Sequence, residues 1–365
     1  MSSITSLSTG AEVAEEHRVL RHDRGLIEWR GAGVFDVAGT DAAGFLDEVC
    51  TRSVAFLFEE RTLAALLLAD DGSVLAIVDL LCRGDSYTVL VWPDQRLVAW
   101  TRLAVKAEGR DGVTLSDRSD STTVLAVEGP RAGAAVEPFL DGSIGQIAYR
   151  SFTTGRWEEA EMVVARIGVT AEFGYTLLVP LQHGDSVRAR LVEMGVRPCG
   201  REAVDVCRME SRFVNLEREC PHPQTTPFEL GLQWMIDFTH GFAARRALLE
   251  RWEAEVMRLP VCFTAPQEAG VVPGDGCCLL TRWSAASPMR SGRRAWDASS
   301  ASPTSTATSP FLACLCPLAV QAAPPRSPPA PAPSWCPPAS PACAGRPPTS
   351  WRASVPSRSR SPASA

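Results

Sequence analysis

The sequence predicts an α+β fold, a multi-lobed body of antiparallel sheets and helices. Apolar runs of strand length, separated by the turns "DDGS" and "RGDS", fill residues 61–93 and are typical of an antiparallel meander. Strand, turn and helix patterns then recur over residues 122–195, which indicates a second half related to the first. Third, apolar residues after Gly276 recur with neither the strand period of 2 nor the helix period of 3.6, and a Pro-rich tail begins there.

The elements follow from local patterns. The first 30 residues resemble an acidic helix that ends near "RGLIEWRG". Residues 33–51 read as a strand and then a short helix capped by Thr40 or Asp41. Leu97, Trp100, Leu103 and Ala104 have helical spacing. The remaining predicted elements are a strand and helix over 122–140, a hairpin over 157–180, helices over 183–195, 199–213 and 225–238 (the last one partly strand), and a helix and strand over 241–266.

Charge and cysteine usage narrow the class of protein. The net charge is −6 overall and +8 after Gly276, which leaves −14 on the first 276 residues. An acidic body argues against non-specific nucleic-acid binding, which needs basic surface.

The six cysteines of the body are scattered without a C-x-x-C pair. This arrangement is typical of reduced thiols in the cytoplasm and does not indicate a metal site. No apolar run reaches the roughly 20 residues of a membrane span, so we expect no membrane contact.

The tail admits two interpretations. Seventeen of the 28 prolines follow Gly276, so regular hydrogen-bonded structure is not expected and the segment is predicted to be disordered. It is either a Pro-rich segment that binds partner proteins or the product of a reading-frame error in a GC-rich gene. The nucleotide sequence around the Gly276 codon distinguishes the two.

Several motifs occur in an order that resembles one known family. "AVEGPRA" (126–132) is similar to a turn written Ala-Leu-Gln-Gly-Pro, and "ARIGVTAEFGYTLLVP" (165–180) to a hairpin written Arg-x-Gly-x-Thr-Gly-Glu-x-Gly-Tyr. "AVDVCRMES" (203–211), "TTPFELGLQW" (225–234) and "GFAARRALLE" (241–250) match three further segments. Together they resemble the aminomethyltransferase family, the folate-binding T-protein of glycine cleavage and its relatives, which include folate-dependent demethylases.

The resemblance implies a domain organisation. It predicts a folate-binding body over residues 1–255, with three lobes around a central hole that holds tetrahydrofolate. It also predicts a small C-terminal β-barrel, of which residues 256–276 form a truncated start. Residues 277–365 form the low-complexity tail.

The resemblance also assigns the cofactor-binding residues. Glu172 lies in a turn between two apolar runs, and a carboxylate there accepts two N–H groups from the edge of the pterin ring. Gly174 lets the backbone approach the ring, and Tyr175 lines the site or packs in the core. A solvated turn carboxylate is the alternative for Glu172.

Two further motif positions concern the anionic folate tail and the end of the predicted strand in "LVWPDQRLVAW" (90–100). Arg208 is the candidate cation for the tail, with an ion pair to Glu210 or Asp205 as the alternative. Val204 stands where the family has another Arg. Trp92 stands where the family has Asn and is kept as a cofactor-binding candidate.

The usual catalytic carboxylate is not found. The family's Asp aligns with Ala99, and its Asp-Asp pair aligns with Ala76 and Ile77. Asp94 is the remaining catalytic candidate, with a helix cap as its alternative role. Whether the chain is an active enzyme therefore stays open at this point.

Three functions are compatible with these residues. The first is the transfer of a methyl or aminomethyl group from a small-molecule donor to tetrahydrofolate. The second is a non-catalytic folate-binding accessory protein. The third is an interaction protein whose Pro-rich tail binds a protein partner.

Overall fold

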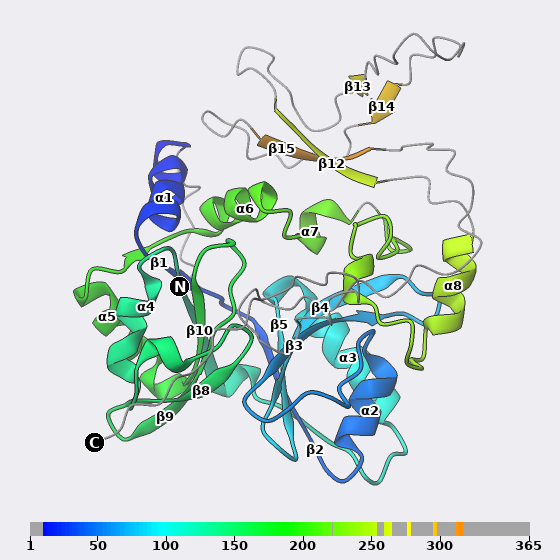
Figure 1. Ribbon diagram of the computed structural model, residues 1–365, viewed down its shortest axis with the longest axis horizontal. Coiled ribbons are helices and arrows are strands. Elements are labelled where there is room, and N and C mark those ends of the chain that lie inside the picture. Colours follow the sequence, from blue (N-terminus) through cyan, green and yellow to red (C-terminus); the bar gives the residue numbers. More distant parts are fainter. Residues whose placement is uncertain are drawn as a thin grey trace, which may run out of the picture. The chain divides into compact units, whose positions relative to one another are not determined.

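The computed structural model describes residues 10–220 and 222–253, together with the backbone of four short strands farther along the chain. The predicted N-terminal helix is present as α1 (Gly10–His22), but it ends before "RGLIEWRG", and residues of that segment form strand β1 (Gly25–Glu28), which was not predicted. The described residues form two large sheets, both largely antiparallel, and two separate strand pairs farther along the chain, and this confirms the predicted α+β class. Figure 1 shows both sheets with helices beside them.

The first sheet has five strands in the order β3-β4-β5-β2-β6. The predicted meander forms its antiparallel core, because the two polar separators make the turns between its strands. The predicted side-chain cap of the helix after β2 is not formed: Asp41 is the N-cap residue but makes no capping hydrogen bond. The elements are β2 (Gly33–Ala38), α2 (Ala42–Val49), β3 (Thr62–Leu68), β4 (Val74–Cys82), β5 (Tyr87–Val91), η1 (Pro93–Gln95), α3 (Arg96–Ala107) and β6 (Thr114–Asp117).

The second sheet has six strands in the order β11-β1-β7-β10-β9-β8. The predicted hairpin is present, since β9 and β10 pair antiparallel with Thr176 opposite Ala165. The elements are η2 (Ser119–Ser121), β7 (Thr122–Glu128), α4 (Ala132–Val136), η3 (Glu137–Phe139), η4 (Ile144–Gln146), β8 (Phe152–Trp157), β9 (Ala160–Ala165), β10 (Gly174–Pro180), α5 (Leu181–Glu193) and β11 (Arg197–Pro198).

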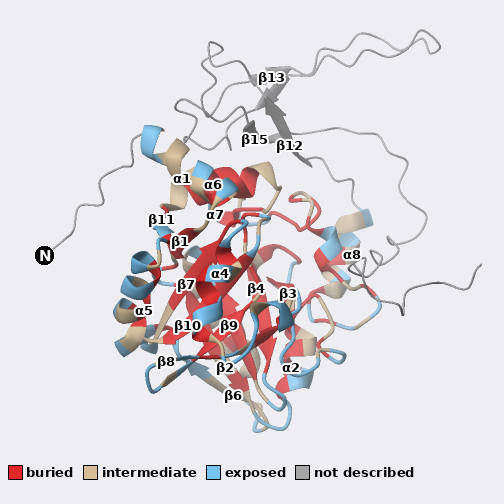
Figure 2. Ribbon diagram, turned by 60° about the vertical axis from the view of Figure 1, so that its left-hand side comes forward, coloured by how far each residue is buried: buried red, intermediate tan, exposed pale blue. Residues whose placement is uncertain are grey.

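Each sheet is covered by helices on one face and buried on the other. One apolar cluster joins α2 and α3 to the first sheet, and another joins α4 and α5 to the second. A third cluster contains side chains from both sheets, among them Leu81, Trp92, Val124 and Leu178, so the remaining faces meet there. Figure 2 shows that much of the central strands, such as β7 and β10, is coloured as buried. Leu97 is an exception to the predicted α3 stripe, because it is 77% exposed and Ala99 is buried in its place.

The segment from Val214 onward packs on a different part of the first sheet. Its apolar side chains join Ala64, Leu66 and Ile77 of β3 and β4 in a fourth cluster. The helix or strand predicted over residues 225–238 is not formed, because the chain there makes turns and one short 3₁₀ helix. Helix α6 (Arg201–Glu210) precedes this segment and packs in the cluster shared by the two sheets. The elements of the segment itself are α7 (Leu216–Glu219), η5 (Gln233–Met235) and α8 (Arg245–Glu253).

Farther along the chain, only backbone pairs are described. Strand β12 (Leu259–Thr264) pairs antiparallel with β15 (Phe311–Cys316), and β13 (Gly276–Cys278) pairs with β14 (Ala295–Asp297). Strands β14 and β15 thus lie in the segment for which the sequence predicted no regular structure. The other residues of the predicted truncated barrel and of the predicted disordered tail lie outside the described residues, as does the boundary at residue 255.

Candidate functional site

A cavity of about 520 Å³ lies where the first sheet meets the start of β8 and the segment after α6. Ala64 and Ile77 form its floor on β3 and β4. Trp234, which is 51% exposed, and the ring of Phe213 bring two aromatic side chains to the same cavity. The full lining is Ala64, Ile77, Asp79, Arg150, Ser211, Arg212, Phe213, Val214, Leu230, Gly231, Leu232, Trp234 and Met235.

Three charged side chains line this cavity. Asp79 on β4 is 7% exposed and forms an ion pair with Arg150, which precedes β8. Burial alone would lower the pKa of Arg150, but the charges and hydrogen bonds of Asp79 and Tyr149 together outweigh it and the pKa is raised. Arg212 follows α6 and lies 3.3 Å from the Glu219 carboxylate. The cavity therefore combines apolar walls, aromatic rings and fixed charges, as small-molecule sites commonly do.

Both arginines have left-handed backbone, with φ of 59° for Arg150 and 57° for Arg212. This region is unfavourable for residues with a Cβ, and such residues tend to occur at ligand sites. Backbone hydrogen bonds hold both arginines: the Arg150 carbonyl accepts from Thr62 N at 2.9 Å, and Arg212 N donates to the Met209 carbonyl at 3.2 Å. The strained backbone thus directs two cationic side chains from separate loops to one cavity.

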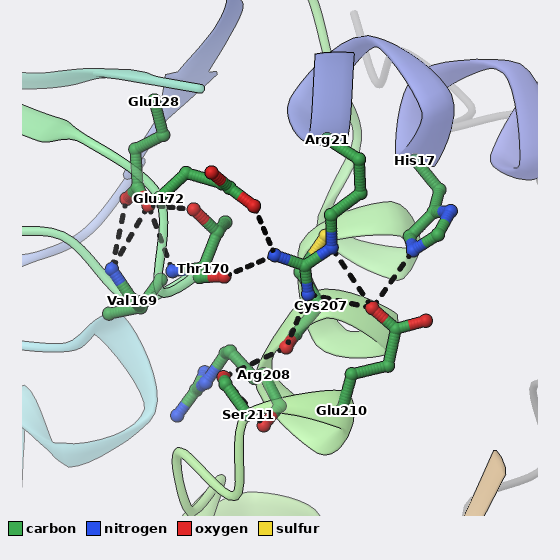
Figure 3. A network of polar contacts seen from close by, with 10 residues as sticks. All are labelled: His17, Arg21, Glu128, Val169, Thr170, Glu172, Cys207, Arg208, Glu210 and Ser211. Atoms are coloured by element: carbon green, nitrogen blue, oxygen red, sulfur yellow. Dashed lines mark hydrogen bonds and ion pairs between the residues drawn. The ribbon is translucent and has the colours of Figure 1, made fainter. Parts of the chain in front are cut away.

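The end of α6 connects the cavity to the Glu172 turn (Figure 3). The carbonyl of Cys207 accepts hydrogen bonds from Ser211 Oγ, at 2.9 Å, and from Arg21 Nη2, at 3.2 Å. Ser211 lines the cavity, while Arg21 projects from α1. Arg21 Nη1 donates to Glu172 Oε1 at 3.1 Å and to the carbonyl of Thr170 at 2.6 Å.

Arg21 is also paired with Glu210 of α6. Its Nη2 donates to Glu210 Oε2 at 2.6 Å, and His17 Nε2 lies 3.0 Å from the same oxygen. Burial lowers the pKa of Arg21, but Glu210, together with Cys207 and Glu172, outweighs this effect and the pKa is raised. For Glu210 the balance is opposite: burial would raise its pKa, and His17 with Arg21 holds it below the usual range. Both groups of the ion pair are therefore charged at neutral pH.

The loop that carries Glu172 is anchored by a second, fully buried carboxylate. Glu128, at the end of β7, accepts hydrogen bonds from Val169 N, Thr170 N and Thr170 Oγ1 at 2.6–3.0 Å through its Oε2 (Figure 3). Burial raises the pKa of Glu128, and these hydrogen bonds oppose that rise without cancelling it. The next residue, Ala171, has φ of 67° where the resembled motif has Gly. The loop is thus held tightly and carries backbone strain.

His17, Cys207 and Glu210 place potential metal ligands within 4.8 Å of one another. The chemistry does not suit a metal ion. Burial raises the pKa of the Cys207 thiol to about 12, so it is not a thiolate at neutral pH. The Arg21 guanidinium already neutralises Glu210 at the same place. We therefore describe the three residues as part of the hydrogen-bonded network.

The structure gives each predicted residue of the hairpin a definite position. The side chain of Glu172 is 28% exposed, and Arg21 is its ion-pair partner. Gly174 packs on Gly168 so closely that a Cβ would lie 2.7 Å from the Gly168 Cα. Tyr175 is 4% exposed and lies in the core between β10 and α4. The structure thus provides packing reasons for Gly174 and Tyr175, and folate contacts for them stay predictions.

The other predicted residues lie deeper. Arg208 is 2% exposed, donates to the carbonyl of Val214 at 2.7 Å and lies 3.7 Å from Asp205. Trp92 is buried against Trp29, with ring centroids 4.6 Å apart. Asp94 lies in η1 and its nearest cation is Arg201, at 3.7 Å. None of the predicted site residues is among the cavity-lining residues of the described chain, and their functional roles stay predictions.

Sequence reasoning missed the residues that line or connect the site. Arg21 lies in the predicted N-terminal helix, to which the sequence assigned no function. Glu128 belongs to the motif "AVEGPRA", which indicated a turn and no role for its carboxylate. The one available signal for Asp79 is alternation: it lies two residues after Ile77 in β4 and so faces the same side of the sheet. Arg150 and Arg212 gave no sequence signal, because the contacts that gather them are not local.

Comparison with known proteins identifies the family. The family model described as "GCVT N-terminal domain" matches residues 6–240. The chain belongs to this family. Tetrahydrofolate is the cofactor of aminomethyltransferases, so family membership agrees with the cofactor predicted from the sequence.

Similar proteins agree with this assignment. An aminomethyltransferase of Thermotoga sp. (strain RQ2) is 27% identical over 253 residues, which are 66% of this chain and 67% of that protein. One from Halothermothrix orenii is 28% identical over 259 residues, 69% and 71% of the two chains. The glycine cleavage system aminomethyltransferase T from Bartonella henselae has the same fold, with a TM-score of 0.68 and 18% identity over 84% of this chain and 81% of that one. In the described part of the chain, no helix has the length and apolar character needed to cross a membrane.

Proposed function

We propose that this protein binds tetrahydrofolate and transfers to it an aminomethyl or methyl group from a small-molecule donor. The observation that supports this most strongly is a chain of hydrogen bonds that joins the cavity residue Ser211, through the carbonyl of Cys207 and Arg21, to Glu172. The relatives named aminomethyltransferase favour the aminomethyl group. The cytoplasmic location and a protein partner stay predictions.

Glu172 retains the capacity to accept hydrogen bonds from a ligand. Its Oε1 accepts one N–H from Arg21, whereas a carboxylate offers about four lone-pair sites. Its partial exposure keeps the carboxylate accessible, and Arg21 with Thr170 fixes where it points. We infer that the amino edge of the pterin ring donates to Glu172 and that the rest of the ligand extends toward the cavity.

The cavity supplies the complementary surface for the remainder of the ligand. Trp234 and Phe213 offer ring faces for stacking. Arg212, whose side chain is 33% exposed, offers a guanidinium group for a carboxylate tail. The predicted tail cation, Arg208, is buried and committed to Val214 and Asp205, so we assign the tail to Arg212. When bound, the reduced folate supplies the nitrogens that accept the one-carbon unit.

Calorimetric titration of the full chain with tetrahydrofolate tests the proposal. We expect saturable binding by the native chain and a loss of affinity of roughly 10- to 100-fold in Glu172→Ala, since a charge-assisted hydrogen bond contributes about 1.5–3 kcal/mol. Glu161→Ala is the matched control, because Glu161 lies in the same sheet and pairs with an arginine, Arg156, at the surface.

The control variant should bind as the native chain does. Equal affinity in Glu172→Ala and the native chain would refute the role of Glu172. Absence of binding by the native chain would refute the proposed function altogether. Binding without transfer from any donor would favour the accessory-protein alternative.

A further inference from the structure

Asp79 is the one acidic side chain among the cavity-lining residues of the described chain. The sequence offered Asp94 as the candidate carboxylate, but Asp94 pairs with Arg201 outside the cavity lining. Asp79 lies two residues beyond Ile77 on β4, and both residues face the cavity. The cavity therefore has a carboxylate although Ala76 and Ile77 replace the acidic pair of the resembled motif.

The contacts of Asp79 leave part of it available to a ligand. Within the described residues, its hydrogen bond from Arg150 Nη1 is received by Oδ1. Its Oδ2 has no protein donor there and is not among the buried polar atoms that lack a partner. This oxygen therefore opens to the cavity. The ion pair with Arg150 holds the Asp79 carboxylate in one orientation. A carboxylate that is already oriented can stabilise a positive charge on the ligand without first having to move.

We infer that Asp79, positioned by Arg150, is the carboxylate that balances the positive charge developing on the folate nitrogens during one-carbon transfer. This inference rests on the proposed function. Arg150 acts as a positioning residue. Apolar neighbours such as Ile77 and Met235 lower the local dielectric and so strengthen the attraction between Asp79 and a cationic ligand.

A comparison of two ligands tests this role without knowledge of the donor. Tetrahydrofolate has a neutral reduced ring, whereas 5,10-methenyltetrahydrofolate carries a positive charge shared by the two nitrogens that hold the carbon. Both dissociation constants are measured by calorimetry on the full chain at the same pH. We expect the ratio of the two affinities to shift against the cationic ligand by roughly 10-fold or more in Asp79→Asn.

Two further variants separate direct contact from indirect effects. Asp79→Asn leaves Arg150 without its partner, which itself repels a cation and destabilises the fold. The double variant Asp79→Asn/Arg150→Met removes both charges, and we expect the same direction of shift. Asp36→Asn is the matched control: Asp36 lies in the same sheet and pairs with Arg118 at 3.2 Å.

The results distinguish this inference from the proposed function. If the native chain binds neither ligand, the proposed function fails and the role of Asp79 with it. If the native chain binds both and the double variant keeps the native ratio, Asp79 has no part in charge balance while folate binding stands. A shift in both Asp79 variants, with a native ratio in Asp36→Asn, supports the inference.

Discussion

Two carboxylates flank the same loop and differ in almost every physical respect. Glu128 is 0% exposed and accepts three short hydrogen bonds from Val169 and Thr170. The Glu172 side chain is 28% exposed and has one ion pair, with Arg21. The buried carboxylate is saturated by the loop itself, whereas the exposed one keeps free acceptor capacity. The presence of an acidic residue at a motif position therefore says less about ligand binding than the number of acceptor sites on it that the protein already uses.

Loss of the buried carboxylate should give the largest effect. Glu128→Ala leaves three donors of the loop without an acceptor, and each unsatisfied buried group costs about 1–3 kcal/mol. We expect a fall of about 2–4 kcal/mol in the free energy of unfolding, measured by urea denaturation. Glu128→Gln keeps one oxygen at the position of Oε2 and should be close to native. An alanine variant as stable as the native chain would contradict the anchoring role.

The pH dependence of the free energy of unfolding should show how much the charge of Glu128 matters, because Glu128→Gln has nearly the same shape but no charge. Burial raises its folded-state pKa above the unfolded value, so its contribution is complete below about pH 4.3 and is lost as the pH rises through the folded-state pKa. Relative to Glu128→Gln, the native chain should therefore lose stability over that range, by at most about 1.4 kcal/mol per pH unit. A difference that stays constant from pH 4 to pH 8 would contradict this.

Relief of the loop strain should give a smaller, stabilising effect. Ala171 has φ of 67°, a region that costs an L-residue about 1–2 kcal/mol and glycine little. After the entropy cost of glycine in the unfolded chain, Ala171→Gly should raise the free energy of unfolding by about 0.5–1 kcal/mol. Ala104→Gly, inside helix α3, is the control and should lower it. Thermal melts of both variants test the sign.

The exposed carboxylate should matter least for stability. In Glu172→Ala, Arg21 keeps Glu210 and the carbonyl of Thr170 as partners. We expect a change in the free energy of unfolding below about 1 kcal/mol. Together with the affinity loss expected for the same variant, this result would separate ligand binding from folding. A loss as large as that of Glu128→Ala would remove the distinction between the two carboxylates.

Local patterns predicted most of the fold but little of the site. Strands β3, β4, β5, β9 and β10 follow from apolar runs and turn residues, which act within a few positions of one another. The segment 225–238 was mispredicted, because its apolar side chains pack against β3 and β4 without forming a regular element. Asp79 and Arg150 are 71 residues apart in the chain, and no local pattern joins them.

Cofactor residues were predicted from motif resemblance, and motifs do not distinguish packing from binding. Tyr175 and Gly174 match the motif, yet the structure accounts for both by contacts inside the protein. Glu172 matches it as well and keeps free acceptor sites. The difference depends on three-dimensional neighbours such as Arg21 and Gly168, which the sequence around the hairpin does not reveal.

A crystal structure of the full chain with tetrahydrofolate tests the central claim most directly. We expect the amino edge of the pterin ring within hydrogen-bond distance of Glu172 and the remainder of the ligand in the cavity lined by Asp79, Arg150 and Trp234. A complex in which Glu172 contacts only Arg21 and solvent, or in which the ligand lies away from this cavity, would contradict it.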